Sequence, residues 1–255
     1  MSGHSKWATI KHKKGAADAK RGRIFTKLIR EITVAAKDGG GSMDTNPRLR
    51  TAIGRAKEAN MPSDNIDKAI KKGTGELPGV LYESSTFEGY AAGGVAILAD
   101  VLTDNKNRSS AEIRNIFSKK GGSLGGAGSV AWQFSTKGYI SIGKSQISED
   151  DIFNLVIDAG AEDVKTEDPA FYEIYCDPKD FEKVKAAVQA KNLKWEEADL
   201  TKLPANKIKV EDVSSAKQIL GLIEALDDHD DVQKVYANFD IADELMEQVA
   251  KEIEG

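Results

Sequence analysis

Lysine and arginine side chains crowd the first thirty residues of the chain. This stretch carries nine of them against one acid, Asp18, giving a formal charge of +8 in a chain whose net charge is −5. Residues 1–75 hold 17 basic and 7 acidic side chains, whereas residues 76–255 hold 19 and 34. Cationic groups bind phosphates, and charge concentrated at one end steers a polyanion to that end. The sequence therefore predicts a nucleic-acid contact through Lys6, Trp7, Lys11, His12, Lys13, Lys14, Lys20, Arg21, Arg23, Lys27, Arg30, Arg48, Arg50, Arg55 and Lys57.

Residues 2–22 are mostly small or basic, with Trp7 and Ile10 as the only large apolar side chains. Burial of so little apolar surface cannot offset the conformational entropy that is lost when a chain becomes ordered. We therefore expect this tail to be mobile in the free protein. Trp7 has two alternative roles. It could stack on an unpaired base while neighbouring lysines meet phosphates, or it could pin the tail to the helices that follow.

Three short helices should position these cations. Residues 23–37 show apolar side chains at three- and four-residue intervals, with Arg23, Lys27 and Arg30 in a stripe on the opposite side. Asn46 followed by Pro47 is a strong start signal for a second helix. Ser63 is expected to cap a third helix, which ends at the Lys71-Lys72-Gly73 run. The three helices predict a small bundle with a cationic surface.

A basic three-helix module resembles a helix-turn-helix DNA reader. The helix in the recognition position begins Ser63-Asp-Asn-Ile-Asp67, however, and acids there would face phosphates. We therefore expect phosphate-directed binding with little base readout. For any single Lys or Arg, a solvated helix surface is the simpler explanation, and only their joint excess favours function.

The remaining chain alternates strands and helices. Strands are expected at 81–90, 94–102, 130–134, 139–142, 163–166, 171–176, 195–201, 208–210 and 232–239, and helices at 108–120, 149–159, 178–190, 213–226 and 241–253. Residues 135–204 follow the split βαβ order, while the segments on either side are each an incomplete layer. We predict an α+β multidomain protein: a basic tail and helical bundle (1–75), and two ferredoxin-like-type α/β domains, of which one (135–204) is inserted into the other (80–134 with 205–240), before a C-terminal helix (241–255).

Two further stretches invite a chemical interpretation. Gly126-Ala-Gly-Ser-Val-Ala131 satisfies a bare dinucleotide fingerprint, but it leads into an expected strand instead of a helix, so we reject nucleotide binding. A flexible or positive-φ connection is the simpler interpretation of residues 121–129, and a nucleic-acid backbone contact is the alternative. Asp227-Asp-His-Asp-Asp231 lacks calcium-loop spacing and is expected to be a solvated acidic turn. We predict no metal and no cofactor.

Composition bounds the remaining classes. The chain has no run of eighteen apolar residues and no apolar core of a secretory signal, so we expect a cytoplasmic protein that does not contact membranes. The lone Cys176 lies in an apolar strand pattern and is expected to be a half-buried structural residue. No local motif combines a nucleophile, a base and an orienting acid, so we predict that the protein is not an enzyme and has no small-molecule substrate. We also expect a monomer.

Several motifs closely resemble those of the YebC/PmpR family, over essentially the whole chain. They are Gly3-His-Ser-Lys-Trp-Ala-Thr-Ile-Lys-His-Lys-Lys-Gly15, Asp18-Ala-Lys-Arg-Gly-Arg-Ile-Phe-Thr-Lys-Leu28, Asn46-Pro-Arg-Leu-Arg50, Ala59-Asn-Met-Pro-Ser-Asp-Asn-Ile66 and Gly121-Gly-Ser-Leu-Gly-Gly-Ala-Gly-Ser-Val-Ala-Trp-Gln-Phe134. The resemblance implies three domains, a helical one and two α/β ones, and no catalytic residue that can be matched. Two turns depart from the pattern: 41–44 lacks a common proline, and Tyr90-Ala-Ala-Gly93 replaces a common glycine-proline pair.

The resemblance implies a regulatory function. Family members are described as DNA-binding transcriptional regulators, and the mitochondrial relatives are translational activators of cytochrome c oxidase. A newer view makes the family ribosome-associated factors that help translation past stretches such as consecutive prolines. Duplex DNA and ribosomal RNA therefore remain alternative targets, and an enzyme with a site between domains is a third hypothesis.

Overall fold

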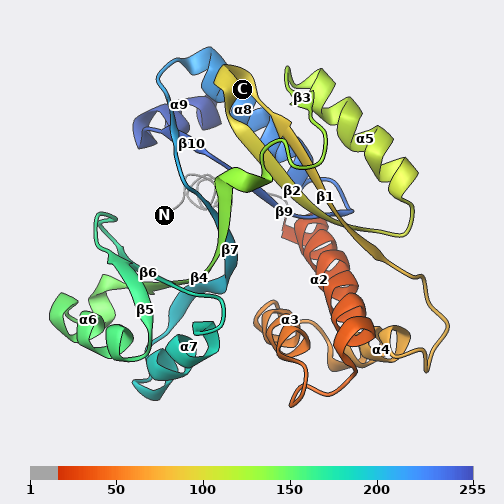
Figure 1. The fold of residues 1–255 in the computed structure, drawn as a ribbon, viewed down its shortest axis with the longest axis vertical. Coiled ribbons are helices and arrows are strands. Elements are labelled where there is room, and N and C mark those ends of the chain that lie inside the picture. The colour runs from red at the N-terminus through yellow and green to blue at the C-terminus, as the bar shows by residue number, and fades with distance from the viewer. Residues whose placement is uncertain (1–16, 255) are drawn as a thin grey trace. The chain divides into compact units, whose positions relative to one another are not determined.

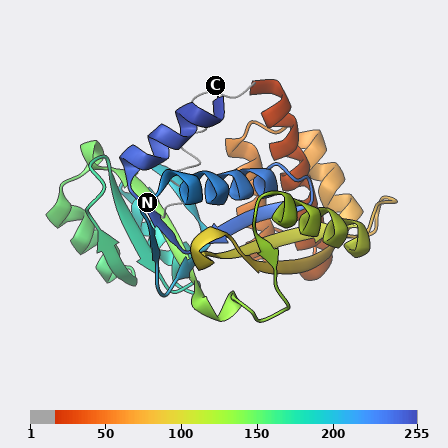
Figure 2. The same cartoon turned by 90° about the horizontal axis from the view of Figure 1, so that it is seen from above.

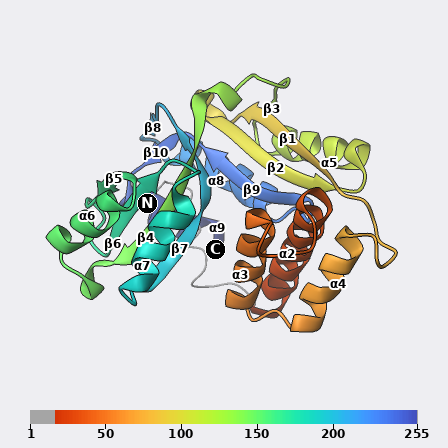
Figure 3. The same ribbon diagram turned by 60° about the horizontal axis from the view of Figure 1, so that its bottom comes forward.

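The computed structural model describes residues 17–254, and the side chains of residues 21–252 (Figure 1). The first described element is α2 (Ala17–Gly39), followed by α3 (Pro47–Glu58) and α4 (Ser63–Gly73). These helices bury a common apolar stripe, and Figure 3 shows them grouped together. The core consists of Leu28, Ile32, Ala35, Ala36, Leu49, Ala52, Ile53, Ala56, Met61, Ile66 and Ala69. The predicted three-helix bundle is thus present.

Asn46 joins the first two helices of the bundle. Its side-chain oxygen accepts a hydrogen bond from Leu49 N at 3.0 Å, and its amide group donates to Ala35 O at 2.7 Å and Gly40 O at 2.8 Å. The predicted cap is therefore confirmed, and the same side chain also satisfies carbonyls at the end of α2.

Two local predictions for the bundle were wrong. Ser63 is already helical, and Pro62 precedes it in an extended conformation, so Ser63 makes no capping hydrogen bond. The helix α2 begins at Ala17, which places residues 17–22 in a helix although we expected them to belong to the mobile tail. Alanine, lysine and arginine in this segment have high helix propensity, which explains the earlier start. The rest of the predicted tail, residues 2–16, lies outside the described residues.

The sheet of the larger compact unit, which we call the larger sheet for this reason, has the strand order β3-β1-β2-β9 and is antiparallel throughout. Its strands are β1 (Glu83–Tyr90), β2 (Ala96–Thr103), β3 (Ser123–Leu124) and β9 (Val232–Ala237). A 3-10 turn, η1 (Ala92–Gly94), joins the first two. The continuous apolar run predicted β2, which lies inside the sheet and is buried on both faces.

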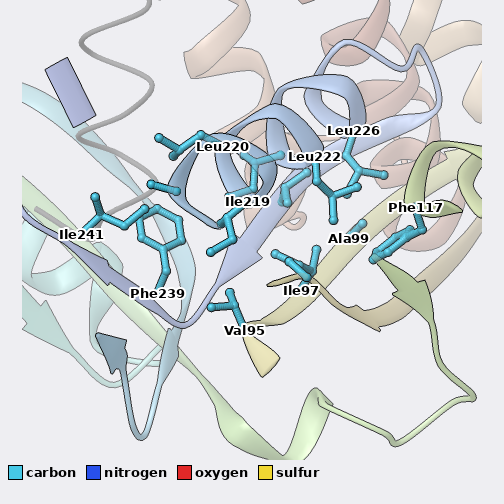
Figure 4. Packing of buried hydrophobic residues seen from close by; sticks show 14 of the residues in the cluster. Val95, Ile97, Ala99, Phe117, Ile219, Leu220, Leu222, Leu226, Phe239 and Ile241 are labelled. Atoms are coloured by element: carbon cyan, nitrogen blue, oxygen red, sulfur yellow. The ribbon is translucent and has the colours of Figure 1, made fainter. Parts of the chain in front are cut away.

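Two helices, α5 (Lys106–Lys119) and α8 (Val213–Asp227), cover one face of this sheet (Figure 2). Figure 4 shows their apolar side chains directed toward the sheet, with Ile219 and Leu222 near Ile97 and with Phe117 near Ala99. The closing helix α9 (Asp243–Glu254) contributes Met246 and Val249 to the same core. The C-terminal helix is therefore part of the packing of this layer.

The predicted strand 232–239 is interrupted at Asn238, whose side-chain oxygen accepts a hydrogen bond from Ala96 N at 2.7 Å. After this residue the chain leaves the sheet. It forms β10 (Phe239–Ile241), which pairs in parallel with β8 (Ile208–Val210). Because a side chain takes over the ladder hydrogen bond, the apolar pattern alone did not reveal the break.

The second compact unit spans residues Trp132–Asn206. Its sheet has the order β5-β6-β4-β7, formed by β4 (Phe134–Gly143), β5 (Ala161–Lys165), β6 (Phe171–Cys176) and β7 (Trp195–Pro204). The helices α6 (Glu149–Asp158) and α7 (Phe181–Ala190) pack on one face, and a 3-10 turn, η3 (Lys144–Gln146), follows β4. This is the split βαβ arrangement, and the α+β multidomain class is confirmed.

Within the described residues, the other compact unit contains the bundle and the larger sheet together, as residues 17–131 and 207–254. The finer division into 1–75, 80–134 with 205–240, 135–204 and 241–255 stays a prediction.

The glycine-rich segment is held by Glu88, a buried residue of β1. Its carboxylate accepts hydrogen bonds from the backbone N–H groups of Gly128, Val130 and Ala131, each at 2.7 Å. Gly128 has φ +82°, which supports the positive-φ interpretation. The predicted strand 130–134 was wrong, because the chain forms a 3-10 turn, η2 (Ala131–Gln133), and β4 begins only at Phe134. Binding of these N–H groups to a carboxylate prevents their use in a strand ladder.

Candidate nucleic-acid interface

The cationic stripe of α2 lies against the acidic turn between α8 and β9, within the larger unit. Lys27 Nζ donates to the carbonyl oxygen of Asp227 at 2.7 Å, and Arg23 pairs with Asp228 at 2.7 Å. Asp227 is the last residue of α8, where carbonyl groups lack helical partners and the helix dipole is negative. The ammonium group of Lys27 thus caps α8 from another part of the chain. Burial lowers the pKa of Lys27, while the charges of Asp227, Asp228 and Asp230 oppose that shift.

Arg30 continues this contact one turn further along α2. Its guanidinium donates to the Asp231 carboxylate at 2.6 Å and also to the carbonyl oxygen of Asp230, and it lies 5.5 Å from the ring centre of Tyr82. Only 13% of the Arg30 side chain and 3% of the Asp231 side chain are exposed. The ion pair is therefore buried, and neither group is available to a ligand in this conformation.

The Asp231 carboxylate also receives hydrogen bonds from the larger sheet and from α5. Ser109 Oγ donates at 2.6 Å, Arg108 at 2.8 Å and Thr103 Oγ1 at 3.2 Å. Burial by itself would raise the pKa of Asp231, but the hydrogen bonds from Ser109 and Arg108 and the charge of Arg30 lower it to about 2. We call Arg30, Thr103, Arg108, Ser109 and Asp231 the Asp231 network. It joins the bundle to the α/β layer.

These contacts correct two expectations. The stripe of Arg23, Lys27 and Arg30 was predicted to form an exposed cationic surface, yet it contacts the turn at 227–231. That turn was expected to be solvated, yet Asp231 is buried. Thr103, Arg108, Ser109 and Asp231 were missed because the contacts of the network join residues 122 to 201 positions apart in sequence. The only signal was charge complementarity between the basic helix and the acidic turn.

The turn and α5 together form the one cluster of possible metal ligands found among residues with described side chains. Glu112, His229 and Asp231 each offer an atom within 4.8 Å of the others. The guanidinium of Arg108 occupies the same neighbourhood, 2.8 Å from Asp231 and 3.9 Å from Glu112. His229 Nε2 lies 2.9 Å from Glu112, and its Nδ1 accepts a hydrogen bond from Asp231 N. Because an arginine already neutralises these carboxylates, the donor set does not suit a metal ion.

The arginines of α3 differ in their surroundings. Arg48 pairs with Glu31 at 2.9 Å and with Asp38 at 3.0 Å, and Arg50 donates to the carbonyl oxygens of Met43 and Asp44. Both therefore hold the connection between α2 and α3. Arg55 and Lys57 lie in the last turn of α3, where a positive charge interacts favourably with the helix dipole.

The remaining candidates belong to the N-terminal region. Arg21 is exposed, with its guanidinium 5.3 Å from the ring centre of Phe25. The side chains of Lys6, Trp7, Lys11, His12, Lys13, Lys14 and Lys20 lie outside the described residues. The structure therefore brings Arg23, Lys27 and Arg30 together on one surface, but commits that surface to an intramolecular contact.

No helix in the described range 17–254 combines the length and apolar character needed to cross a lipid bilayer.

Comparison with known proteins finds two family models along the chain. Residues 5–76 match the TACO1/YebC protein N-terminal domain, and residues 82–239 match the TACO1/YebC second and third domain. A protein of Syntrophobacter fumaroxidans is 56% identical over 250 residues, covering 98% of this chain and 100% of the relative. A protein of Desulforapulum autotrophicum is 57% identical over 245 residues, covering 96% and 98%. Both relatives carry the name "Probable transcriptional regulatory protein".

A solved structure is also similar. The crystal structure of a conserved hypothetical protein, Aq1575, from Aquifex aeolicus aligns with a TM-score of 0.82 and 45% sequence identity, covering 92% of this chain and 96% of that one.

Proposed function

Since this chain belongs to the TACO1/YebC family, we propose that it is a non-enzymatic regulatory protein that binds nucleic acid through its N-terminal region. The relatives' shared name supports a regulatory role, and transcription regulation through DNA is the first candidate. The observation that carries nucleic-acid binding is the charge separation: residues 1–75 have a net charge of +10, and residues 76–255 a net charge of −15. An acidic body would be repelled by phosphates, so binding would orient the basic end toward them.

The structure suggests how the candidate residues divide. Lys27 and Arg30 are held by the acidic turn, and Arg48 and Arg50 hold the α2–α3 connection. We therefore assign most phosphate contacts to Lys6, Lys11, Lys13, Lys14, Lys20 and Arg21, with Lys57 at the end of α3. Trp7 and His12 lie within this lysine-rich run and are candidates for contacts to bases.

A salt titration tests this assignment. Replacing Lys6, Lys11, Lys13, Lys14 and Lys20 by Gln should flatten the slope of log K against log salt by about 4.5 on duplex DNA, or about 3.5 on single strands. A control variant replaces five exposed lysines elsewhere, namely Lys183, Lys191, Lys194, Lys207 and Lys251. Equal slopes for the tail variant and the parent protein would contradict the proposal.

The second candidate function is that of a ribosome-associated translation factor in the cytoplasm, which would use the same basic end to bind ribosomal RNA. Trp7 favours it, because an aromatic side chain among lysines suits unpaired bases of structured RNA. A competition titration at one fixed salt concentration, offering labelled protein both ribosomes and generic duplex DNA, separates the two. Preference for ribosomes that depends on residues 1–16 supports the translation factor. Preference for DNA that sharpens on particular sequences supports the transcription regulator.

A further inference from the structure

The outward face of α5 differs in charge from the acidic α/β body around it. The helix turns Ser109, Ile113, Ile116 and Phe117 toward the larger sheet and α8. Figure 1 shows α5 at the edge of its layer, and its opposite face is exposed. Short polar or small side chains occupy this face at helical spacing, together with Arg114. An open depression of about 500 Å³ runs along it, lined by Asn107, Ser110, Ala111, Arg114, Asn115 and Ser118.

The charge of this helix is opposite to that of the surrounding body. Residues 106–120 contain five basic side chains, Lys106, Arg108, Arg114, Lys119 and Lys120, and one acid, Glu112. They lie in a region, residues 76–255, whose net charge is −15. The acid Glu112 stands beside Arg108 and His229, and the depression itself is lined by no carboxylate. The local excess of positive charge therefore remains unneutralised on this helix.

Four of these five cations have no ion pair within the part of the chain whose side chains are described. Arg108 donates to Asp104 and Asp231 and is part of the Asp231 network. Lys106, Arg114, Lys119 and Lys120, in contrast, make no ion pair or side-chain hydrogen bond with residues 21–252. This is the reverse of α2, where Lys27 and Arg30 are already bound to acidic partners. Cations without partners can bind a ligand without first breaking an internal contact.

We propose that the outward face of α5 is a second contact for the phosphate backbone of a nucleic acid, a proposal that rests on the function proposed above. The guanidinium of Arg114 offers a bidentate fork suited to a phosphate, and Lys106 and Lys119 flank it toward the two ends of the helix. The amides of Asn107 and Asn115 and the hydroxyls of Ser110 and Ser118 offer hydrogen-bond donors along the depression. This set is typical of backbone positioning, which carries no base specificity. The contact would therefore hold nucleic acid at the body as well as at the basic end.

The test is a salt titration of the full chain carrying Lys106→Gln, Arg114→Gln and Lys119→Gln. Losing three phosphate contacts should weaken binding and flatten the slope of log K against log salt by about 2.7 on duplex DNA or about 2.1 on single-stranded RNA. The matched control replaces Lys183, Lys191 and Lys194 by Gln, which removes the same charge from exposed positions of the unit Trp132–Asn206. The control should leave the slope unchanged. Circular dichroism checks that both variants keep the parent's helix content.

The outcomes separate the two proposals. The α5 contact would be overturned if the triple α5 variant had the same salt slope as its control while the tail variant had a flatter slope than the parent. The proposed function would then remain. A parent protein that binds neither DNA nor RNA would overturn both. A third arm uses polyglutamate as an acidic polypeptide. If the α5 variant loses affinity for polyglutamate but none for nucleic acid, the face binds an acidic protein and our proposal is wrong.

Discussion

Replacing Asp231 by Asn should destabilise the joint between the bundle and the α/β layer. The change keeps the shape of the side chain but removes the charge that Arg30 and Arg108 contact at 2.6 and 2.8 Å. Arg30 would remain buried without a counter-charge, and its Nε already lacks a hydrogen-bond partner within the described side chains. Breaking a buried ion pair by removing one partner costs about 3–5 kcal/mol. We therefore expect the free energy of unfolding to fall by about 2–5 kcal/mol, the lower end allowing for hydrogen bonds that Asn retains.

The same residue predicts a specific dependence on pH. The pKa of Asp231 is about 2 in the folded protein, below the value of 3.8 for a free aspartate. A lowered pKa means that the charged form stabilises the fold, by about 2 kcal/mol at neutral pH. This contribution is complete above about pH 5, and it is lost as the pH falls through 3.8 toward 2. The difference in stability between the parent and Asp231→Asn should therefore shrink over that interval.

Urea denaturation followed by circular dichroism, at pH 7 and at about pH 3, measures both effects. Asp104→Asn is the matched control, because Asp104 also accepts a hydrogen bond from Arg108 at 2.8 Å but is 36% exposed. Exposed ion pairs contribute about 0–1 kcal/mol, so the control should lie close to the parent. If Asp231→Asn matched Asp104→Asn, or lost the same free energy at both pH values, the buried network would not be the joint that we describe.

Two further predictions concern the body. Glu88→Gln should destabilise the protein by about 1–3 kcal/mol and speed amide hydrogen exchange at Gly128, Val130 and Ala131, because three hydrogen bonds to a carboxylate become weaker or are lost; unchanged exchange at these three amides would contradict the role of Glu88. The Cys176 thiol should react with a thiol reagent at pH 8 only on unfolding, because it is fully buried and burial raises its pKa to about 11; rapid labelling of the folded protein, compared with the same protein in urea, would exclude this.

Local sequence patterns were enough for most of the fold. The Asn46-Pro47 start signal, the apolar stripe of the bundle and the apolar run of β2 each depend on residues close together in the chain, and each predicted its element. The break at Asn238 and the 3-10 turn before β4 were missed because a side chain replaces a backbone hydrogen-bond partner there. Whether a side chain takes the place of a backbone partner depends on residues of neighbouring strands, which are distant in sequence.

The candidate site was predicted less well for a related reason. Counting charges identified the basic end of the chain, but it did not show that Lys27 and Arg30 are held by a turn some 200 residues later. The same count, applied to the whole body, hid the basic helix α5 inside a region of net −15. Charge composition predicts that a partner exists, whereas only the fold decides which cations are already paired.

The distance in sequence between α2 and its acidic turn has a consequence for biosynthesis. Ribosomes add about 5–20 residues per second, so α2 is made about 10–40 seconds before Asp227–Asp231. During that interval Arg23, Lys27 and Arg30 have no carboxylate from the turn to contact. Their positive charges are therefore not neutralised by the turn while the nascent chain is still on the ribosome. In the finished protein all three side chains contact the turn, and Lys27 and Arg30 become partly buried there. The nascent chain should thus bind polyanions more tightly than the mature molecule, and this affinity should decline once the turn has been synthesised.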